Sequence, residues 1–483
     1  MKFNKPLFWL PLLFLGLTVF TIDNGHDWGD DFALYISQAR SILNQNSDEL
    51  LLNNQWMMKN SEGLIGPELY PWGYPVFLSG LIGLFGDLAV GSKIVQWVFL
   101  SLVALFSACH ILKRFQFEKD SGVYFFLLGL MVFHPKILLY ANRFNSDLFF
   151  LVGVYLFWAI LFWVRAQKKL RNPIFYEIVL GLLIMVLSQT RDVGLFLLFP
   201  FLLNSVTKWR HFHFKIPMIT GVLFSFSIVL LYVVGKTESG NIHLSELDFS
   251  LIPGLIVTYL KLFGQYAFVM LKQVNHTLSE WFGLGIGCLV LFVFMRRART
   301  ILKSYWLELS WIIPNILLLL IWPSVQGERF LFPWIWLVFI ILFDHVSRQK
   351  LSSMLQKVFV PVLTLALWLQ ISSSIVYHIK IDTDEISNES TTDMFDFFHT
   401  STSEDAVVYF KKPRLMYLKS HRRSLFSTIT DKETSVIEKC NYLVENRKPI
   451  QGYLPNFSDD HKGELVFEND AYRIYKRNLK AKP

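Results

Sequence analysis

Charged residues are scarce in this sequence, and so are cysteines. Asp, Glu, Lys and Arg make up only 17% of its 483 residues, against about 25% in a soluble globular chain. Cys109 and Cys288 lie in apolar segments and Cys440 stands alone near the end, so no disulfide framework is implied. The sequence has no Walker loop, Rossmann glycine fingerprint, His-Glu-x-x-His motif or cysteine-rich metal signature. A soluble nucleotide-binding site of the Rossmann type is therefore unsupported.

Apolar residues take the place of the missing charge. They form 53% of the chain, aromatic residues form 16%, and the mean hydropathy is +0.39. Several apolar runs approach or exceed the roughly 17–25 residues that a membrane-spanning helix needs. The first run follows Lys2 and Lys5 and has no small-residue cleavage site after it, so we interpret it as a retained first span. The sequence predicts an α-helical polytopic membrane protein.

The net charge of +8 comes from short basic clusters between the apolar runs. This pattern is typical of cytoplasmic loops and differs from the continuous basic face of a nucleic-acid-binding protein. The clusters are Lys113-Arg114, Lys168-Lys169 with Arg171, Lys208 with Arg210, and Arg296-Arg297 with Arg299. Placing them inside puts the N-terminus in the cytoplasm. It also puts the loop 23–87 and the tail from about residue 379 outside.

We predict about eleven transmembrane helices from the apolar runs. They are expected near residues 6–22, 90–112, 121–139, 147–164, 174–189, 193–206, 216–234, 281–295, 306–322, 330–343 and 358–377. The runs 71–86 and 252–270 do not fit this topology as spans, so each is interpreted as an interfacial or re-entrant helix on the outer face.

The chain is predicted to divide into a membrane domain, residues 1–378, and a small extracytoplasmic α/β domain, residues 379–483. The tail is polar, and helical patterns separate the first two of its short β-type runs. These runs cover residues 406–410, 442–445, 464–467 and 471–475.

Two adjacent acids, Asp30 and Asp31, follow the first span. The residues after them, among them Phe32 and Tyr35, place apolar side chains on one face and predict an amphipathic helix. One interpretation is that an acid of the pair caps this helix. The other is a partly desolvated carboxylate at the membrane surface, basic enough to take a proton from a hydroxyl. His26 and Asp27 alone are weak support for a metal site, and we expect them to be solvated loop residues.

The acidic pair belongs to a series of segments that lie between the apolar runs in a fixed order. They are Gly29–Tyr35, Pro67–Pro71 with Tyr74-Pro75, Leu84–Gly86, Pro135 with Tyr140–Asp147, Gln189–Gly194 and Gln326–Pro333. Their order resembles the GT-C glycosyltransferases, in the bacterial branch related to protein O-mannosyltransferases and lipid A aminoarabinose transferases, and the resemblance extends from residue 6 to about 345. In that branch the first acid of an Asp-Glu or similar pair is the proposed catalytic base. The pair here is Asp-Asp, which leaves open which acid serves.

Four cations break the positive-inside trend by lying at the outer ends of spans. They are Lys136, Arg143, Arg191 and Arg329. A cation placed there costs insertion free energy and usually has an anionic partner. That partner is either a lipid headgroup, an internal acid such as Asp147 or Glu328, or the phosphate of a polyprenyl-phosphate sugar. Arginine suits phosphate because its planar guanidinium binds it bidentately, and we prefer Arg191 and Arg329 because both lie in tight polar turns.

The resemblance implies a hexosyl- or pentosyltransferase that inverts the anomeric centre at the outer face of a bacterial plasma membrane. Asp30 or Asp31 is expected to be the base, with Asp147, Glu328 and Tyr35 in support. The expected partners are a polyprenyl-phosphate sugar donor, a lipid, glycan or protein acceptor, and membrane lipid, but no nucleic acid. The sequence names no cofactor and leaves a divalent metal ion open. The alternatives are a lipid-linked sugar flippase or other transporter, and a polysaccharide polymerase.

Overall fold

The computed structural model describes most of the chain. The described residues are 5–23, 26, 29–62, 66–86, 90–117, 120–167, 172–209, 221, 225, 249–267, 275–322, 325, 327–348, 360–380, 386–427, 432–447, 457 and 462–477. The chain forms two compact units. We call the first the helical unit; it contains Met1–Thr21, Trp97–Tyr140 and Ser146–Tyr377. The second, the loop–tail unit, contains Ile22–Gln96, Ala141–Asn145 and His378–Pro483.

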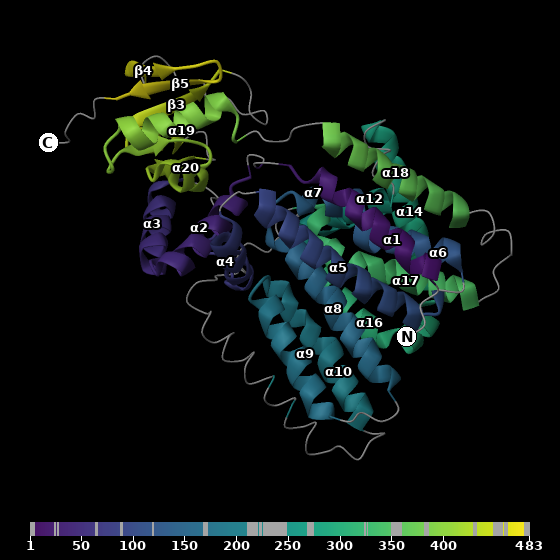
Figure 1. Cartoon of the computed structure of the whole chain (residues 1–483). Helices are drawn as coiled ribbons and strands as arrows, with labels where there is room; N and C mark the ends of the chain where they lie inside the picture. Colours follow the sequence, from purple (N-terminus) through teal and green to yellow (C-terminus); the bar gives the residue numbers. More distant parts are fainter. Residues whose placement is uncertain are drawn as a thin grey trace. The chain divides into compact units, whose positions relative to one another are not determined.

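Apolar helices make up the helical unit, and Figure 1 shows α8 and α9 running side by side. α5 begins in the loop–tail unit and continues here. The α-helices are α1 (Lys5–Thr18), α5 (Val90–Arg114), α6 (Ser121–Leu128), α7 (Pro135–Ala141), α8 (Ser146–Ala166), α9 (Pro173–Ser188), α10 (Leu198–Trp209), α12 (Ile252–Ala267), α14 (His276–Arg296), α15 (Ala298–Ser304), α16 (Trp306–Ile321), α17 (Phe332–Arg348) and α18 (Val360–Lys380). Shorter turns are η1 (Val19–Thr21), η3 (Gly129–Phe133), η4 (Asp192–Leu197), η6 (Phe249–Leu251) and η7 (Glu328–Phe330).

The positions of these helices agree with the predicted spans. Every predicted range holds an apolar helix except 216–234, which lies outside the described residues apart from Gly221 and Ser225. Among the described residues, five helices are long and apolar enough to cross a membrane, or six if the pair α15–α16, bent by 112°, counts as one span. The chain is a multi-pass membrane protein, and the count of eleven spans stays a prediction.

Helix packing in this unit relies on large buried aromatics and on close backbone approach. Trp97 is buried and donates to Thr18 Oγ1 over 2.9 Å, which ties α5 to α1. α12 packs against α14 through Gly264, Gly283 and Gly287, where an added Cβ would collide with backbone of the facing helix. Small residues allow this approach in membranes, where packing rather than the hydrophobic effect drives helix association. The described part of the run 252–270, residues 252–267, is helical as predicted, while its place at the outer face stays a prediction.

The loop–tail unit combines helices from the first loop with a small sheet from the tail. Its helices are α2 (Asp31–Asn44), α3 (Ser47–Asn60), α4 (Gly73–Phe85), α19 (Glu389–Ser401), α20 (Pro413–Ser420) and α21 (Glu433–Ile437). Its strands are β1 (Val407–Tyr409), β2 (Arg423–Leu425), β3 (Tyr442–Asn446), β4 (Glu464–Glu468) and β5 (Tyr472–Lys476), in the order β2-β1-β3-β5-β4. β1 is parallel to β2 and β3, whereas β5 is antiparallel to β3 and β4. The predicted small α/β region is confirmed, and the strand that the sequence missed is β2.

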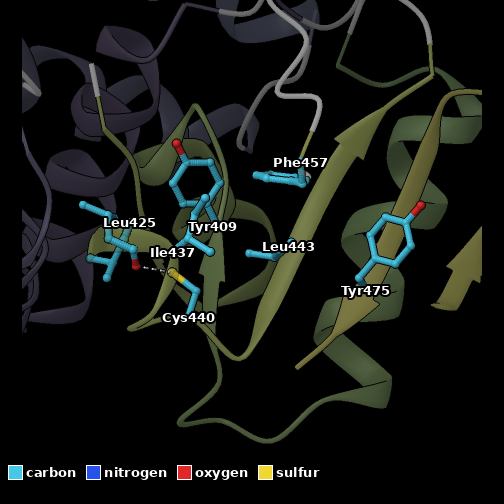
Figure 2. Packing of buried hydrophobic residues seen from close by; sticks show 8 residues of the cluster. Tyr409, Leu425, Ile437, Cys440, Leu443, Phe457 and Tyr475 are labelled. Carbon is cyan, nitrogen blue, oxygen red and sulfur yellow. Dashed lines mark hydrogen bonds between the residues drawn. The ribbon is translucent and has the colours of Figure 1, made fainter. Parts of the chain in front are cut away.

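One face of this sheet carries the tail's hydrophobic core. Figure 2 shows Tyr409, Leu443 and Tyr475 on the strands, with Phe457 and Cys440 packed against them. Each large apolar side chain buried in this way stabilises the fold by about 1.5–3 kcal/mol relative to exposure. Burial also raises the pKa of the Cys440 thiol, so this cysteine is a core residue rather than a reactive one.

The first loop and the tail are joined by direct contacts. Arg40 on α2 donates to the carbonyl of Leu418 on α20 over 3.3 Å. After α3 the chain pairs with the tail next to β2, because Glu62 and Ser427 form a parallel bridge and Glu62 N donates to Phe426 O. The sequence assigned residues 23–87 to the membrane domain, whereas the structure groups residues 22–96 with the tail. The consequence is that side chains of the tail reach the acidic pair.

Candidate functional site

The acidic pair lies at the start of α2, a helix whose first turn is almost wholly buried. The sequence gives this helix an apolar face, and that face packs against the rest of the unit. Phe32, Tyr35 and Ala39 on it are therefore buried. Asp30 precedes the helix in the N-cap position, but its side chain makes no capping hydrogen bond. Helix capping therefore does not explain Asp30.

The carboxylate of Asp30 instead faces the N-terminus of α20. Its Oδ1 accepts from Leu415 N over 3.3 Å, and its Oδ2 lies 3.9 Å from Arg414 Nε. The first N–H groups of a helix have no partner within the helix and attract an anion. Burial raises the pKa of Asp30, while the charges of Arg414 and Lys412 and the Leu415 N–H oppose that rise. Such a carboxylate is more basic than one in water, yet it keeps a nearby positive charge.

Asp31 has a different partner. Its Oδ1 accepts a 2.6 Å hydrogen bond from the Tyr70 hydroxyl. The Gln38 side-chain amide fixes the Tyr70 backbone in both directions, since its Oε1 accepts from Tyr70 N and its Nε2 donates to Tyr70 O. Burial and the Asp31 charge raise the pKa of Tyr70, so the phenol keeps the proton that it donates. Tyr35, predicted to support the site, stacks on Tyr70 with ring centroids 4.5 Å apart.

Three of the predicted outer cations converge in the helical unit. Arg191 NH1 lies 2.8 Å from Asp147 Oδ1, and Lys136 Nζ lies 3.1 Å from Glu328 Oε2. The guanidinium carbons of Arg191 and Arg329 lie 4.9 and 5.3 Å from the centroid of the same ring, that of Phe330. Two of the cations thus have internal acids as partners.

Arg143 belongs to the other unit, in the segment Ala141–Asn145. The backbone carbonyl of Arg143 accepts from Gln96 Nε2 over 3.5 Å, and Asn142 Oδ1 accepts from Asp23 N over 3.1 Å. The structure therefore groups Arg143 with Asp30, Asp31 and Tyr35, and it groups Lys136, Asp147, Arg191, Glu328 and Arg329 in the helical unit.

The expectation for His26 is wrong. It is buried rather than solvated, because its ring stacks on Phe32 at 3.7 Å and its Nε2 accepts from Phe144 N. Its neighbour Asp27 lies outside the described residues. Within the described ranges no group of three or more His, Cys, Asp or Glu side chains is arranged to hold a metal ion.

Sequence reasoning did not assign to the site two residues that contact the pair, Arg414 and Tyr70. It also missed a fully buried lysine in the same unit, Lys93, whose Nζ lies 3.6 Å from Asp23 Oδ1. A signal for Lys93 existed, because a cation inside an apolar helix is costly and marks a function or an ion pair. Arg414 gave none, since 385 residues separate its neighbour Leu415 from Asp30.

The sequence matches no family model and no curated protein. Its structure, however, is similar to that of ArnT from Cupriavidus metallidurans in the apo state, with a TM-score of 0.54 and 11% identity over 98% of both chains. The same protein bound to undecaprenyl phosphate gives a TM-score of 0.53 and 10% identity, again over 98% of both chains.

The chain has the GT-C fold. The match to ArnT runs the whole length of both proteins, so the GT-C arrangement includes the tail and does not stop at the apolar helices. The oligosaccharyltransferase AglB from Archaeoglobus fulgidus, in complex with an inhibitory peptide and a dolichol-phosphate, matches 78% of this chain and 61% of its own at 10% identity and a TM-score of 0.47.

Proposed function

We propose that this GT-C protein is a glycosyltransferase that moves a sugar from a polyprenyl-phosphate donor to an acceptor hydroxyl. The observation that carries the proposal is a partly buried carboxylate, Asp30, held at the start of α2 in a chain that shares the full length of the ArnT fold. The acceptor is a lipid, glycan or protein, and the sugar is a hexose or pentose. ArnT has been solved bound to undecaprenyl phosphate, and this supports a lipid-linked donor here.

The proposed reaction is a single displacement. Asp30, or alternatively Asp31, takes the proton of the acceptor hydroxyl while the acceptor oxygen bonds to the anomeric carbon. The bond from that carbon to the phosphate oxygen breaks, and polyprenyl phosphate leaves with the electron pair. Attack opposite the leaving group inverts the anomeric configuration. General-base catalysis of this kind contributes about 10²–10⁴-fold.

The leaving phosphate needs cationic stabilisation, which is often the largest part of such catalysis. We assign this role to Arg191 and Arg329, with Arg143 and Lys136 as further candidates. Their shared contact with Phe330 supports the assignment, because it holds two guanidinium groups around one ring. Asp147 and Glu328 would hold the cations in place until phosphate binds.

The proposal includes a location. We infer a bacterial plasma membrane, a cytoplasmic N-terminus, a membrane domain of residues 1–378 and an extracytoplasmic domain of residues 379–483. Support comes from the basic clusters in the loops between the predicted spans, because loops rich in Lys and Arg favour the cytoplasmic side of the membrane.

The proposal is tested by sugar transfer in proteoliposomes. Wild type, Asp30→Asn and Asp31→Asn are incubated with a radiolabelled polyprenyl-phosphate sugar and candidate acceptors. Asp396→Asn, an exposed acid on α19, is the matched control. We expect loss of about 10²-fold or more in one of the two variants of the pair and none in the control. Full activity in both variants would remove the catalytic assignment, and transport without transfer in wild type would favour a flippase.

A further inference from the structure

We propose that Arg414, from the C-terminal region, is the positioning residue for Asp30, and that the tail is therefore part of the catalytic machinery. This inference rests on the proposed function, because it concerns the acid that we assign as the base. It is carried by the way Arg414 is held, by the position of one of its donors near Asp30, and by its contact with the partner of Asp31.

The guanidinium of Arg414 is fixed by residues from the first loop. Its NH2 group donates to the carbonyl of Pro67, and its central carbon lies 5.8 Å from the centroid of the Tyr70 ring. It also lies against Gly66, where a Cβ would sit only 3.1 Å from both NH1 and NH2. The φ of +91° at Gly66 favours glycine, and an added Cβ would also push the guanidinium away by a few tenths of an ångström. The loop is thus built to accept this side chain.

One donor of the fixed guanidinium lies near the acid and has no hydrogen-bond partner among the described residues. This donor is the Nε of Arg414, whose side chain is 2% exposed. The Nε lies 3.9 Å from Asp30 Oδ2, about 1 Å beyond a hydrogen bond. A buried donor is normally satisfied. A small movement of the Asp30 carboxylate would close this gap, so the pair holds the acid in place without locking it.

The charges around Asp30 define what Arg414 contributes. Asp31 on α2 lies next in the chain and repels it, while Lys412, Arg414 and the Leu415 N–H at the start of α20 attract it. A general base has to be ionised before it can take a proton. Among the attracting groups Arg414 is the strongest, and it opposes the rise in the Asp30 pKa that burial causes. Arg414 therefore keeps a desolvated base in its working form.

Arg414 also reaches the second acid through Tyr70. The ring over which its guanidinium lies carries the hydroxyl that donates to Asp31. If the guanidinium were displaced, the Tyr70 ring would lose its contact with Arg414, and the hydrogen bond from the Tyr70 hydroxyl to Asp31 would weaken. The geometry of both acids then depends on one arginine of the tail.

Arg422 shows what a purely structural arginine of the tail looks like. It is buried like Arg414, but its donors go to Thr402 Oγ1 and to the carbonyls of His399, Thr402 and Ser420, all in the tail itself. It makes no contact with the acidic pair. Substitution of Arg422 is therefore a matched control for loss of a buried arginine from the same region.

The first test is the pH profile of kcat/KM for wild type, Arg414→Gln, Arg414→Lys and Arg422→Gln. Removal of an adjacent positive charge raises a carboxyl pKa by about 1–3 units, so the acidic limb of Arg414→Gln should move upward by that amount. Arg414→Lys keeps the charge and should move the limb less. Arg422→Gln should lower Tm without moving the acidic limb of the pH profile. An unmoved limb in Arg414→Gln, or an equal shift in Arg422→Gln, overturns the inference.

A second readout does not need transfer. A hydrophobic carbodiimide modifies protonated carboxyls. The full-length, detergent-solubilised protein is labelled at a series of pH values and then digested, and mass spectrometry of the peptides gives the labelling of Asp30 against pH. We expect the labelling midpoint to lie higher in Arg414→Gln than in wild type and unchanged in Arg422→Gln. If wild type transfers no sugar but the midpoint moves, the proposed function fails and the link between Arg414 and Asp30 stands. If wild type is active and the midpoint stays, the inference on Arg414 fails alone.

Discussion

The helical unit and the loop–tail unit each contain an aspartate beside an arginine, and the two pairs differ. Asp147 and Arg191 lie 2.8 Å apart, and the acid is 2% exposed. Asp30 and Arg414 lie 3.9 Å apart, and there the arginine is 2% exposed while the acid is 16% exposed. The first pair buries its carboxylate, whereas the second buries its guanidinium and leaves the carboxylate accessible.

This difference separates two uses of the same chemistry. A buried carboxylate in contact with an arginine holds that cation, and removing either partner leaves an uncompensated charge. A partly exposed carboxylate without a close ion pair, such as that of Asp30, can accept a proton and change its position afterwards. We therefore infer that Asp147 holds Arg191 in place in the helical unit, whereas Arg414 holds Asp30 in place in the loop–tail unit.

The strongest way to break the comparison is to neutralise each acid in turn. We expect Asp30→Asn to lower kcat by about 10²-fold or more with an intact fold. Asp147→Asn should act first on stability, by about 3 kcal/mol, because it leaves Arg191 without its anionic partner. Transfer rates and thermal unfolding of both variants give the result. A large loss of stability in Asp30→Asn with unchanged kcat would reverse the two assignments.

Double-mutant cycles measure the same contrast as coupling free energies. The cycle of Asp147→Asn with Arg191→Gln should give about 2 kcal/mol, and the cycle of Asp30→Asn with Arg414→Gln a smaller value of about 1.4 kcal/mol, the equivalent of one pKa unit, since coupling falls with separation. Unfolding free energies in mixed detergent micelles supply both cycles. Equal couplings would show that the difference between 2.8 and 3.9 Å has no energetic meaning.

The pH dependence of stability sharpens the comparison further. Because burial raises the pKa of Asp30 in the folded state, this group stabilises the fold at low pH and loses that contribution as pH rises through the folded pKa. The Tm difference between Asp30→Asn and wild type should therefore become more favourable to the variant as pH rises, and be least favourable in acid. Thermal unfolding scans across pH, with Asp396→Asn as the exposed control, check this direction. A difference that falls as pH rises would contradict it.

The fold could largely be predicted because the membrane constrains it. A spanning segment has to satisfy its backbone hydrogen bonds internally, so long apolar runs gave the positions of α5, α8 and α14 correctly. Weakly patterned pieces were missed. β2 is only Arg423-Ser424-Leu425, too short and polar for a strand signal, and it forms because β1 pairs with it in parallel.

The site could be predicted only as far as it is local. Asp30 and Asp31 were found because adjacent acids after a span are unusual along the chain itself. His26 was misread, because its burial comes from stacking on Phe32 and contact with the backbone of Phe144, neither of which a sequence pattern records. Arg414 depends on the docking of α20 beside α2, a contact between segments about 380 residues apart. Such pairings come from tertiary packing, which competes with and overrides local pattern.

The smallest effect is expected from a methyl group. Gly66→Ala places a Cβ 3.1 Å from the Arg414 guanidinium at a φ of +91°. Gly86 offers a matched control, because it has a φ of +84° and nothing within 4 Å of the added Cβ. Both substitutions should cost about 1–3 kcal/mol of backbone strain, but only Gly66→Ala displaces the arginine from Asp30. We expect a several-fold lower kcat/KM and an acidic limb at higher pH for Gly66→Ala alone. Identical profiles for the two variants would mean that Arg414 tolerates displacement, and the loose pair would then be incidental to the acid it faces.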